Sequence, residues 1–210
     1  MPETLPRHPL EIPAAIVCVT QLHARTALLV EGWSDEAALE AWAARCETRL
    51  ADHAVIVLPV GGITNMTKFA AALKAHDATL RLGGLYDASE ESLALRGLER
   101  AGLDAGPGLT RARARALGFF ACECDLEDEL IRALGTEAVE RVLDTQGELV
   151  SFRRFQKQPF QHGRDMHSQL KRFLGTRAGR KARYGTLLVQ ALAPERVPSP
   201  LREVLAHALA

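Results

Sequence analysis

Acidic side chains stand at the ends of short apolar runs at several places in the sequence. The carboxylates placed in this way are Glu31, Asp35, Asp87, Asp125 and Glu127. Unpaired carboxylates that come together repel one another, and a hard cation such as Mg²⁺ or Mn²⁺ with oxygen ligands is the usual compensation. Two such ions about 4 Å apart activate water and stabilise the leaving oxygen of a phosphoryl displacement. The pattern therefore predicts metal-dependent phosphodiester chemistry.

Most of these carboxylates also have an ordinary structural explanation. Asp35 suits the start of a helix, and Asp87 and Asp125 could each cap the helix that follows. Glu127 could form an ion pair with Arg132. Glu31 is the hardest to explain by packing, since it follows an apolar run and precedes a glycine.

Four apolar runs separated by helical patterns predict βαβ units and a mainly parallel, four-stranded α/β sheet flanked by helices. We expect strands over residues 26–31, 53–60, 79–86 and 118–124. Helices are expected over 34–49, 64–76 and 90–101, the first capped by Ser34, and a glycine-rich loop over 102–108. Ligands of open α/β sheets bind at the carboxyl ends of the strands, where this order of elements would gather the carboxylates.

Beyond position 126 only helical patterns are convincing, and they predict a C-terminal helical extension. The expected helices cover 128–134, 136–146, 151–156, 166–174, 179–192 and 200–209. We divide the chain into an N-terminal segment (1–24), a catalytic core (25–134) and a helical, basic extension (135–210). The proline-containing residues before about position 24 are left without an assigned element.

The formal net charge is zero, but the charges are segregated. Ten basic residues and one acidic residue lie between positions 151 and 183. A basic track for a nucleic-acid backbone would produce this split, and so would a solvated helix face. The candidate backbone-binding residues are Arg153, Arg154, Lys157, Lys171, Arg172, Arg177, Arg180 and Arg183.

Several classes of protein are not expected. The apolar runs are far shorter than the roughly 20 residues of a membrane-spanning helix, and the first residues do not resemble a secretory signal, so we expect a cytoplasmic protein. The four cysteines lack the paired CxxC spacing of a zinc site, so zinc is not expected.

Three segments carry a family resemblance. The run 28–35 (LLVEGWSD) resembles the first motif of TOPRIM domains, the run 59–65 (PVGGITN) resembles their glycine turn, and Asp87 lies where they have an Asp-x-Asp motif. The segment Asp125-Leu126-Glu127 resembles a later motif of the overcoming lysogenization defect (OLD) nucleases. Residues 25–192 are thus similar to stand-alone OLD-like TOPRIM proteins.

This resemblance implies a metal-dependent DNA endonuclease, a hydrolase of phosphodiester bonds. It implies that Glu31, Asp35, Asp87, Asp125 and Glu127 hold Mg²⁺ or Mn²⁺ in a two-metal site. Glu31 and Asp87 would be catalytic together with Lys181, for which Lys171, Arg180 and Arg183 are alternatives. Gly32, Gly61 and Gly62 would let the backbone or the substrate approach closely.

The sequence departs from the family pattern at two points. Ser89 stands where the second Asp of Asp-x-Asp is expected, and Glu90 or Glu91 could replace it by reaching back from the next helical turn. The motif GxxxxGK[ST] is absent, so any ATPase would be a separate partner. The alternative hypothesis is therefore a TOPRIM module that binds nucleic acid, DNA or RNA, or a partner ATPase without cleaving.

Overall fold

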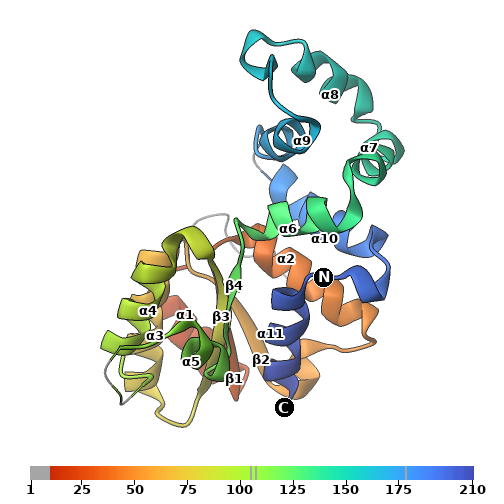
Figure 1. Ribbon diagram of the computed structural model, residues 1–210. Helices are drawn as coiled ribbons and strands as arrows, with labels where there is room; N and C mark the ends of the chain where they lie inside the picture. Colours follow the sequence, from red (N-terminus) through yellow and green to blue (C-terminus); the bar gives the residue numbers. More distant parts are fainter. Residues whose placement is uncertain (1–9, 105, 107, 178) are drawn as a thin grey trace.

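A four-stranded, all-parallel sheet forms the centre of the protein. The computed structural model describes residues 10–104, 106, 108–177 and 179–210. The strands β1 (Thr26–Val30), β2 (Val55–Pro59), β3 (Arg81–Asp87) and β4 (Phe119–Cys122) are arranged in the order β2-β1-β3-β4. Every residue of β1 is buried, as expected for a central strand that is covered on both faces. The predicted α/β sheet is confirmed (Figure 1).

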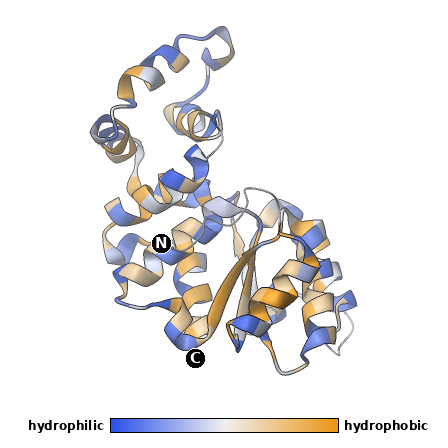
Figure 2. Cartoon of the chain, turned by 180° about the vertical axis from the view of Figure 1, so that it is seen from behind, coloured by the Kyte–Doolittle hydropathy of each residue, from blue (hydrophilic) through white to orange (hydrophobic). Residues whose placement is uncertain are grey.

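Helices cover both faces of the sheet. One face is covered by α1 (Ile12–Gln21), α3 (Ile63–His76), α4 (Glu91–Arg100) and α5 (Arg111–Ala116). The other is covered by α2 (Trp33–Arg45), α10 (Arg180–Ala191) and α11 (Ser199–Leu209). The hydropathy colouring shows apolar strands between amphipathic helices (Figure 2), and each face has its own apolar core.

Four helices follow between β4 and α10: α6 (Leu126–Leu134), α7 (Thr136–Thr145), α8 (Leu149–Gln156) and α9 (Met166–Leu174). Of these, α6 lies beside α10 at the base, and α7, α8 and α9 project from this base as an arm (Figure 1). Short 3₁₀ turns complete the chain: η1 (Leu50–His53), η2 (Ala88–Glu90), η3 (Pro159–Gln161) and η4 (Pro194–Arg196).

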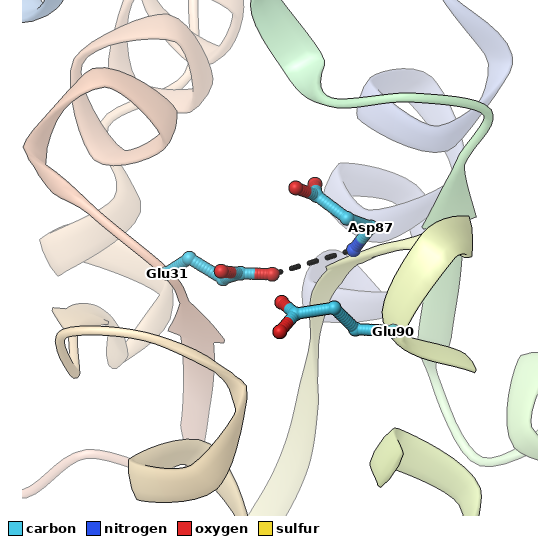
Figure 3. Close-up of side chains that lie close together, drawn as sticks. All are labelled: Glu31, Asp87 and Glu90. Carbon is cyan, nitrogen blue, oxygen red and sulfur yellow. Dashed lines mark hydrogen bonds between the residues drawn. The ribbon is translucent and has the colours of Figure 1, made fainter. Parts of the chain in front are cut away.

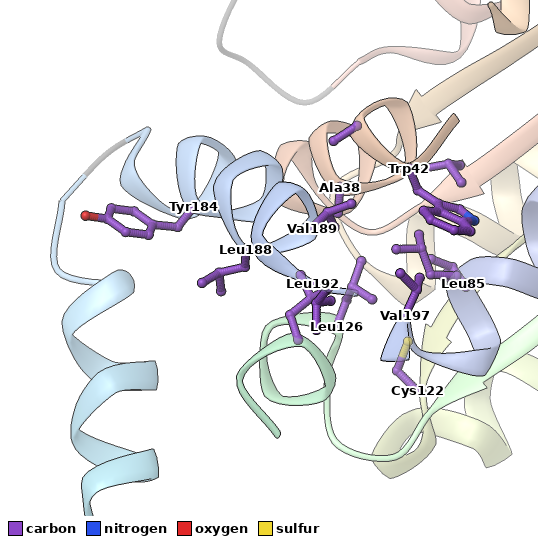
Figure 4. Close-up of a cluster of buried hydrophobic side chains, with 14 of the residues drawn as sticks. Ala38, Trp42, Leu85, Cys122, Leu126, Tyr184, Leu188, Val189, Leu192 and Val197 are labelled. Carbon is purple, nitrogen blue, oxygen red and sulfur yellow. The ribbon is translucent and has the colours of Figure 1, made fainter. Parts of the chain in front are cut away.

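After the arm, the chain returns to the sheet as helix α10, which packs closely on α2. Leu188, Val189 and Leu192 join Ala38 and Trp42 in one buried cluster (Figure 4). The contact requires a glycine in α10, because a Cβ at Gly185 would lie 2.6 Å from the carbonyl oxygen of Ser34. This packing places the second turn of α10 against the first turn of α2.

Some elements differ from the sequence-based expectation. Gly32, not Ser34, caps α2, because the Asp35 carboxylate accepts the Gly32 N–H at 2.8 Å. The helix α1 occupies part of the segment left without an element, with a proline tolerated in its first turn, and α5 was also not predicted. Residues 1–9 of the N-terminal segment and residues 105 and 107 of the glycine-rich loop lie outside the described residues. Among the described helices, none has the length and apolar character to cross a membrane.

Candidate metal centre

Three carboxylates converge at the carboxyl ends of the two central strands. Glu31 follows β1, Asp87 ends β3, and Glu90 lies in η2 directly after it. One oxygen of each carboxylate lies within 4.8 Å of the others (Figure 3). The Asp87 N–H also donates to Oε1 of Glu31 at 3.3 Å, which links the two strand ends. We call Glu31, Asp87 and Glu90 the carboxylate triad.

The triad is a site of concentrated negative charge. Burial and, after it, the neighbouring carboxylates of Glu31 and Asp125 together raise the pKa of Asp87 to about 7. Burial and the Glu90 carboxylate also raise the pKa of Glu31. Within the described chain, no lysine, arginine or histidine forms an ion pair with these three groups. Oxygen ligands that repel one another in this way suit a divalent cation.

The sequence offered Glu90 and Glu91 as replacements for the carboxylate that is missing at Ser89. Of these two, Glu90 is the one that lies beside Asp87. In a 3₁₀ turn, residues three apart lie on the same side, so η2 brings Glu90 back beside Asp87. Glu91 instead pairs with Arg111. Ser89 belongs to the same turn, and neither Ser89 nor Glu90 is among the described residues that line the pocket found beside Asp87.

Asp35 combines the two roles considered for it. Its carboxylate caps the start of α2 through the Gly32 N–H, and it lies in the wall of the same pocket as Glu31 and Asp87. Burial raises the pKa of Asp35 to about 8, and the carboxylates of Glu127, Glu31 and Asp87 act in the same direction. Asp35 therefore favours its protonated form near neutral pH when no cation is bound.

Asp125 and Glu127 line the same pocket but have cationic partners. Asp125 caps α6 by accepting the Asp128 N–H at 2.8 Å, and its other oxygen lies 2.8 Å from Nζ of Lys171. Glu127 is 5% exposed and lies 3.2 Å from Nζ of Lys181. The expected pair between Glu127 and Arg132 is wrong, because Arg132 turns to Asp128 at 2.7 Å and to Glu129.

A pocket of about 650 Å³ joins these groups. Its charged lining consists of Glu31, Asp35, Asp87, Asp125, Glu127 and Lys181. Gly32 and Gly62 also line it, and Gly62 has a φ of +104° with open space where a Cβ would stand. Gly61 is a further turn residue, and the amides of Gly61 and Gly62 donate to the Glu31 carbonyl oxygen at 2.9 and 3.2 Å.

The sequence matches one known family over part of its length. Residues 22–81 match the family model of the overcoming lysogenization defect protein-like TOPRIM domain. This match covers 60 of the 210 residues, from just before β1 to the first residue of β3. No match was found among curated proteins.

Solved structures of two OLD proteins have a fold similar to that of this chain. The C-terminal region of the Xanthomonas campestris pv. campestris OLD protein is 22% identical with a TM-score of 0.65, over 89% of this chain and 94% of that one. The C-terminal region of the Burkholderia pseudomallei OLD protein is 19% identical with a TM-score of 0.63, over 88% and 96% of the two chains. The similarity extends over most of the sheet and the arm.

Not all eight candidate basic residues are presented to a ligand. Arg180 is 5% exposed, and its guanidinium lies 2.9 Å from Glu148 and 4.1 Å from the centre of the Phe173 ring. The guanidinium of Arg180 is therefore held by internal partners, and its expected contact with a phosphate stays a prediction. Arg153, Lys171 and Arg183 also form ion pairs. The remaining four are exposed and form no ion pair within the described chain: Arg154, Lys157, Arg172 and Arg177.

The sequence did not identify several residues of the pocket. Trp33 and Ser34 line the pocket from the first turn of α2, and Gly179 and Ala182 line it from the start of α10. Trp33 and Ser34 adjoin the Glu-Gly motif, which was a usable signal. Gly179 and Ala182 are placed by the packing of α10 on α2, which no local pattern reveals.

Proposed function

We propose that the protein is a divalent-metal-dependent nuclease that hydrolyses phosphodiester bonds of DNA. The observation that carries this proposal is the carboxylate triad, in which three acidic groups converge without a cationic partner in the described chain. The OLD-like TOPRIM match of residues 22–81 supports the same chemistry.

The chain offers two groups of ligands for Mg²⁺ or Mn²⁺. Glu31, Asp87 and Glu90 would hold one ion. Asp35, Asp125 and Glu127 would serve a second, and there Lys171 and Lys181 supply the positive charge in the metal-free protein. A bound divalent ion supplies Lewis-acid stabilisation of phosphate charge and acidifies a water molecule.

Lys181 is the cation placed to act on the substrate. Burial acts to lower its pKa, but the Glu127, Asp125 and Asp35 carboxylates outweigh burial and raise it, so Lys181 stays protonated. Its side chain is 51% exposed and lines the pocket, which leaves the ammonium group accessible. We assign it to binding the negative charge that develops on the scissile phosphate.

The arm would hold the DNA backbone. Arg154, Lys157, Arg172 and Arg177 are exposed and lack ion-pair partners in the described chain. Phosphate contacts of this kind position a duplex without reading its sequence. They account for binding without specifying a recognition site.

Nicking of supercoiled plasmid tests the proposal. We expect nicking with Mn²⁺ or Mg²⁺ that EDTA abolishes and that the double variant Glu31→Gln, Asp87→Asn loses. The matched control is Glu91→Gln, which removes a neighbouring carboxylate that pairs with Arg111 outside the triad. Nicking that survives in the double variant contradicts the proposal, and salt-sensitive DNA binding without any cleavage supports the non-cleaving alternative.

A further inference from the structure

One aromatic side chain stands exposed in the arm. Phe160 is 79% exposed, the largest fraction among the exposed large hydrophobic residues of the described chain. It lies in η3, between α8 and α9, in the segment at the end of the arm remote from the sheet (Figure 1). Phe152, Phe155 and Phe173 pack against one another instead, with ring centres 5.2 to 6.5 Å apart.

The backbone around Phe160 is held in place by hydrogen bonds. Nε2 of Gln169 donates to the carbonyl oxygens of Gln161 and Arg164, each at 3.1 Å. Nε of Arg164 donates to the Phe160 carbonyl oxygen at 2.9 Å. The neighbouring Gln161 is 2% exposed, so the turn buries the side chain of Gln161 and directs that of Phe160 into solvent. The outward position of Phe160 is thus built into the turn.

The surroundings of Phe160 are basic. Residues 149–164 contain no aspartate or glutamate, and they include Arg153, Arg154, Lys157 and Arg164. Arg154 and Lys157 form no ion pair with any described residue. An exposed aromatic ring among unpaired cations is complementary to nucleic acid, whose backbone is anionic and whose bases offer flat apolar faces.

The shape of the tip favours a duplex over a single strand. Proteins that bind single strands stack successive bases on several aromatic side chains along a groove. The arm exposes one phenylalanine on a projecting turn, as do proteins that insert an apolar side chain between two base pairs. We propose that Phe160 is a wedge that inserts at a base step of duplex DNA, with preference for a step that is interrupted or poorly stacked.

The position of the Phe160 wedge relates it to the pocket. The nine-residue helix α9 begins beyond the wedge and carries Lys171, which contacts Asp125 in the pocket wall. The wedge and the triad would therefore engage the same duplex, and this part of the inference rests on the proposed function.

Binding and base unstacking in EDTA test the wedge without requiring cleavage. The probe is a duplex with a one-nucleotide gap flanked by 2-aminopurine, compared with the same duplex without the gap. We expect the full chain to bind the gapped duplex more tightly and to raise its fluorescence. Phe160→Ala should lose the rise and bind the gapped duplex about tenfold more weakly, whereas Phe160→Trp should retain both.

Two control variants separate stacking from other effects. Val150→Ala removes another exposed apolar side chain of the arm, 64% exposed, and should change neither signal. Lys157→Ala should weaken binding to both duplexes equally. It should also reduce the slope of log affinity against log salt concentration by about one, as expected for the loss of one phosphate contact. A Phe160→Ala protein that binds and unstacks like the parent overturns the inference and indicates a protein partner for this surface. Absence of binding to either duplex also overturns it.

The two proposals can fail separately. Loss of the fluorescence rise in Phe160→Ala, observed in EDTA, stands whether or not the protein nicks plasmid with Mn²⁺. Conversely, metal-dependent nicking by a protein whose Phe160→Ala variant behaves like the parent leaves the nuclease proposal intact and removes the wedge.

Discussion

The ammonium group of Lys181 lies 3.2 Å from Oε1 of Glu127, and this pair connects the first turn of α10 to the first turn of α6 in the pocket wall. Glu127 is almost fully buried, whereas the Lys181 side chain is half exposed. The glutamate thus fixes the position of a cation that the substrate can still reach. Removing Lys181 should therefore have a different consequence from removing Glu127.

Replacing Lys181 should slow cleavage without loss of the metal. We expect Lys181→Met to reduce the rate of plasmid nicking about 100-fold, because one preorganised positive charge at the scissile phosphate is lost. Mn²⁺ affinity, measured by titration calorimetry, should be equal or higher, because a cation that competes for Glu127 has been removed. A parallel loss of metal affinity and activity would show that Lys181 maintains the site instead. Lys181→Arg is the charge-preserving control.

Replacing Glu90 should weaken metal binding, whereas replacing Glu91 should not. Glu90→Gln removes one carboxylate of the triad, so we expect at least a tenfold lower Mn²⁺ affinity by calorimetry. Glu91→Gln removes the adjacent carboxylate, which pairs with Arg111, and should bind Mn²⁺ like the parent. If Glu90→Gln binds Mn²⁺ as tightly as Glu91→Gln and the parent, Glu90 is not a metal ligand. The carboxylate missing at Ser89 would then have no replacement.

The sheet and most helices could be predicted because their causes are local. Buried parallel strands require continuous apolar runs, and the runs ending at Glu31 and Asp87 predicted both the strands and the acidic edge. The choice of Glu90 over Glu91 depended on the 3₁₀ geometry of η2, which sequence did not reveal. The pairs of Asp125 with Lys171 and Glu127 with Lys181 depend on the arm folding back, a long-range effect without a local signal.

Arg180 illustrates how a basic run can mislead. In the sequence it is indistinguishable from Arg177 and Arg183, but its side chain lies between Glu148 and the Phe173 ring. We expect Arg180→Ala to lower the free energy of unfolding by about 3 kcal/mol, because the half-buried Glu148 would keep only Arg183 and the contact with the Phe173 ring would be lost. Arg177→Ala, at an exposed position, should change it by less than about 0.5 kcal/mol. Urea denaturation measures both.

If Arg180→Ala instead unfolds at the urea concentration of the parent and binds DNA more weakly, Arg180 contacts phosphate and the buried position is not maintained in solution. Binding of an undamaged duplex, measured by fluorescence anisotropy, provides this second readout. For Arg177→Ala the expectation is reversed, with weaker binding at unchanged stability.

The metal-free protein should lose stability as the pH rises from about 4 to about 8. The pKa of Asp35 is raised from 3.8 to about 8 and that of Asp87 to about 7, so the folded state holds protons that the unfolded state has released. Stability is fully present below the unfolded pKa and is lost as the pH rises through the folded pKa. In EDTA, the free energy of unfolding from urea titration should fall between pH 5 and pH 9 by an amount on the order of a few kcal/mol.

Asp35→Asn separates this effect from other titrating groups. The amide oxygen can still accept the Gly32 N–H, but the group no longer ionises, so the variant should lose much of the decline. Saturating Mg²⁺ should restore most of the stability of the parent at pH 9, because a bound cation favours the ionised carboxylates. A decline of equal size in Asp35→Asn would place the titration elsewhere, with Asp87 and Glu36, whose pKa burial raises to about 7, as the next groups to replace.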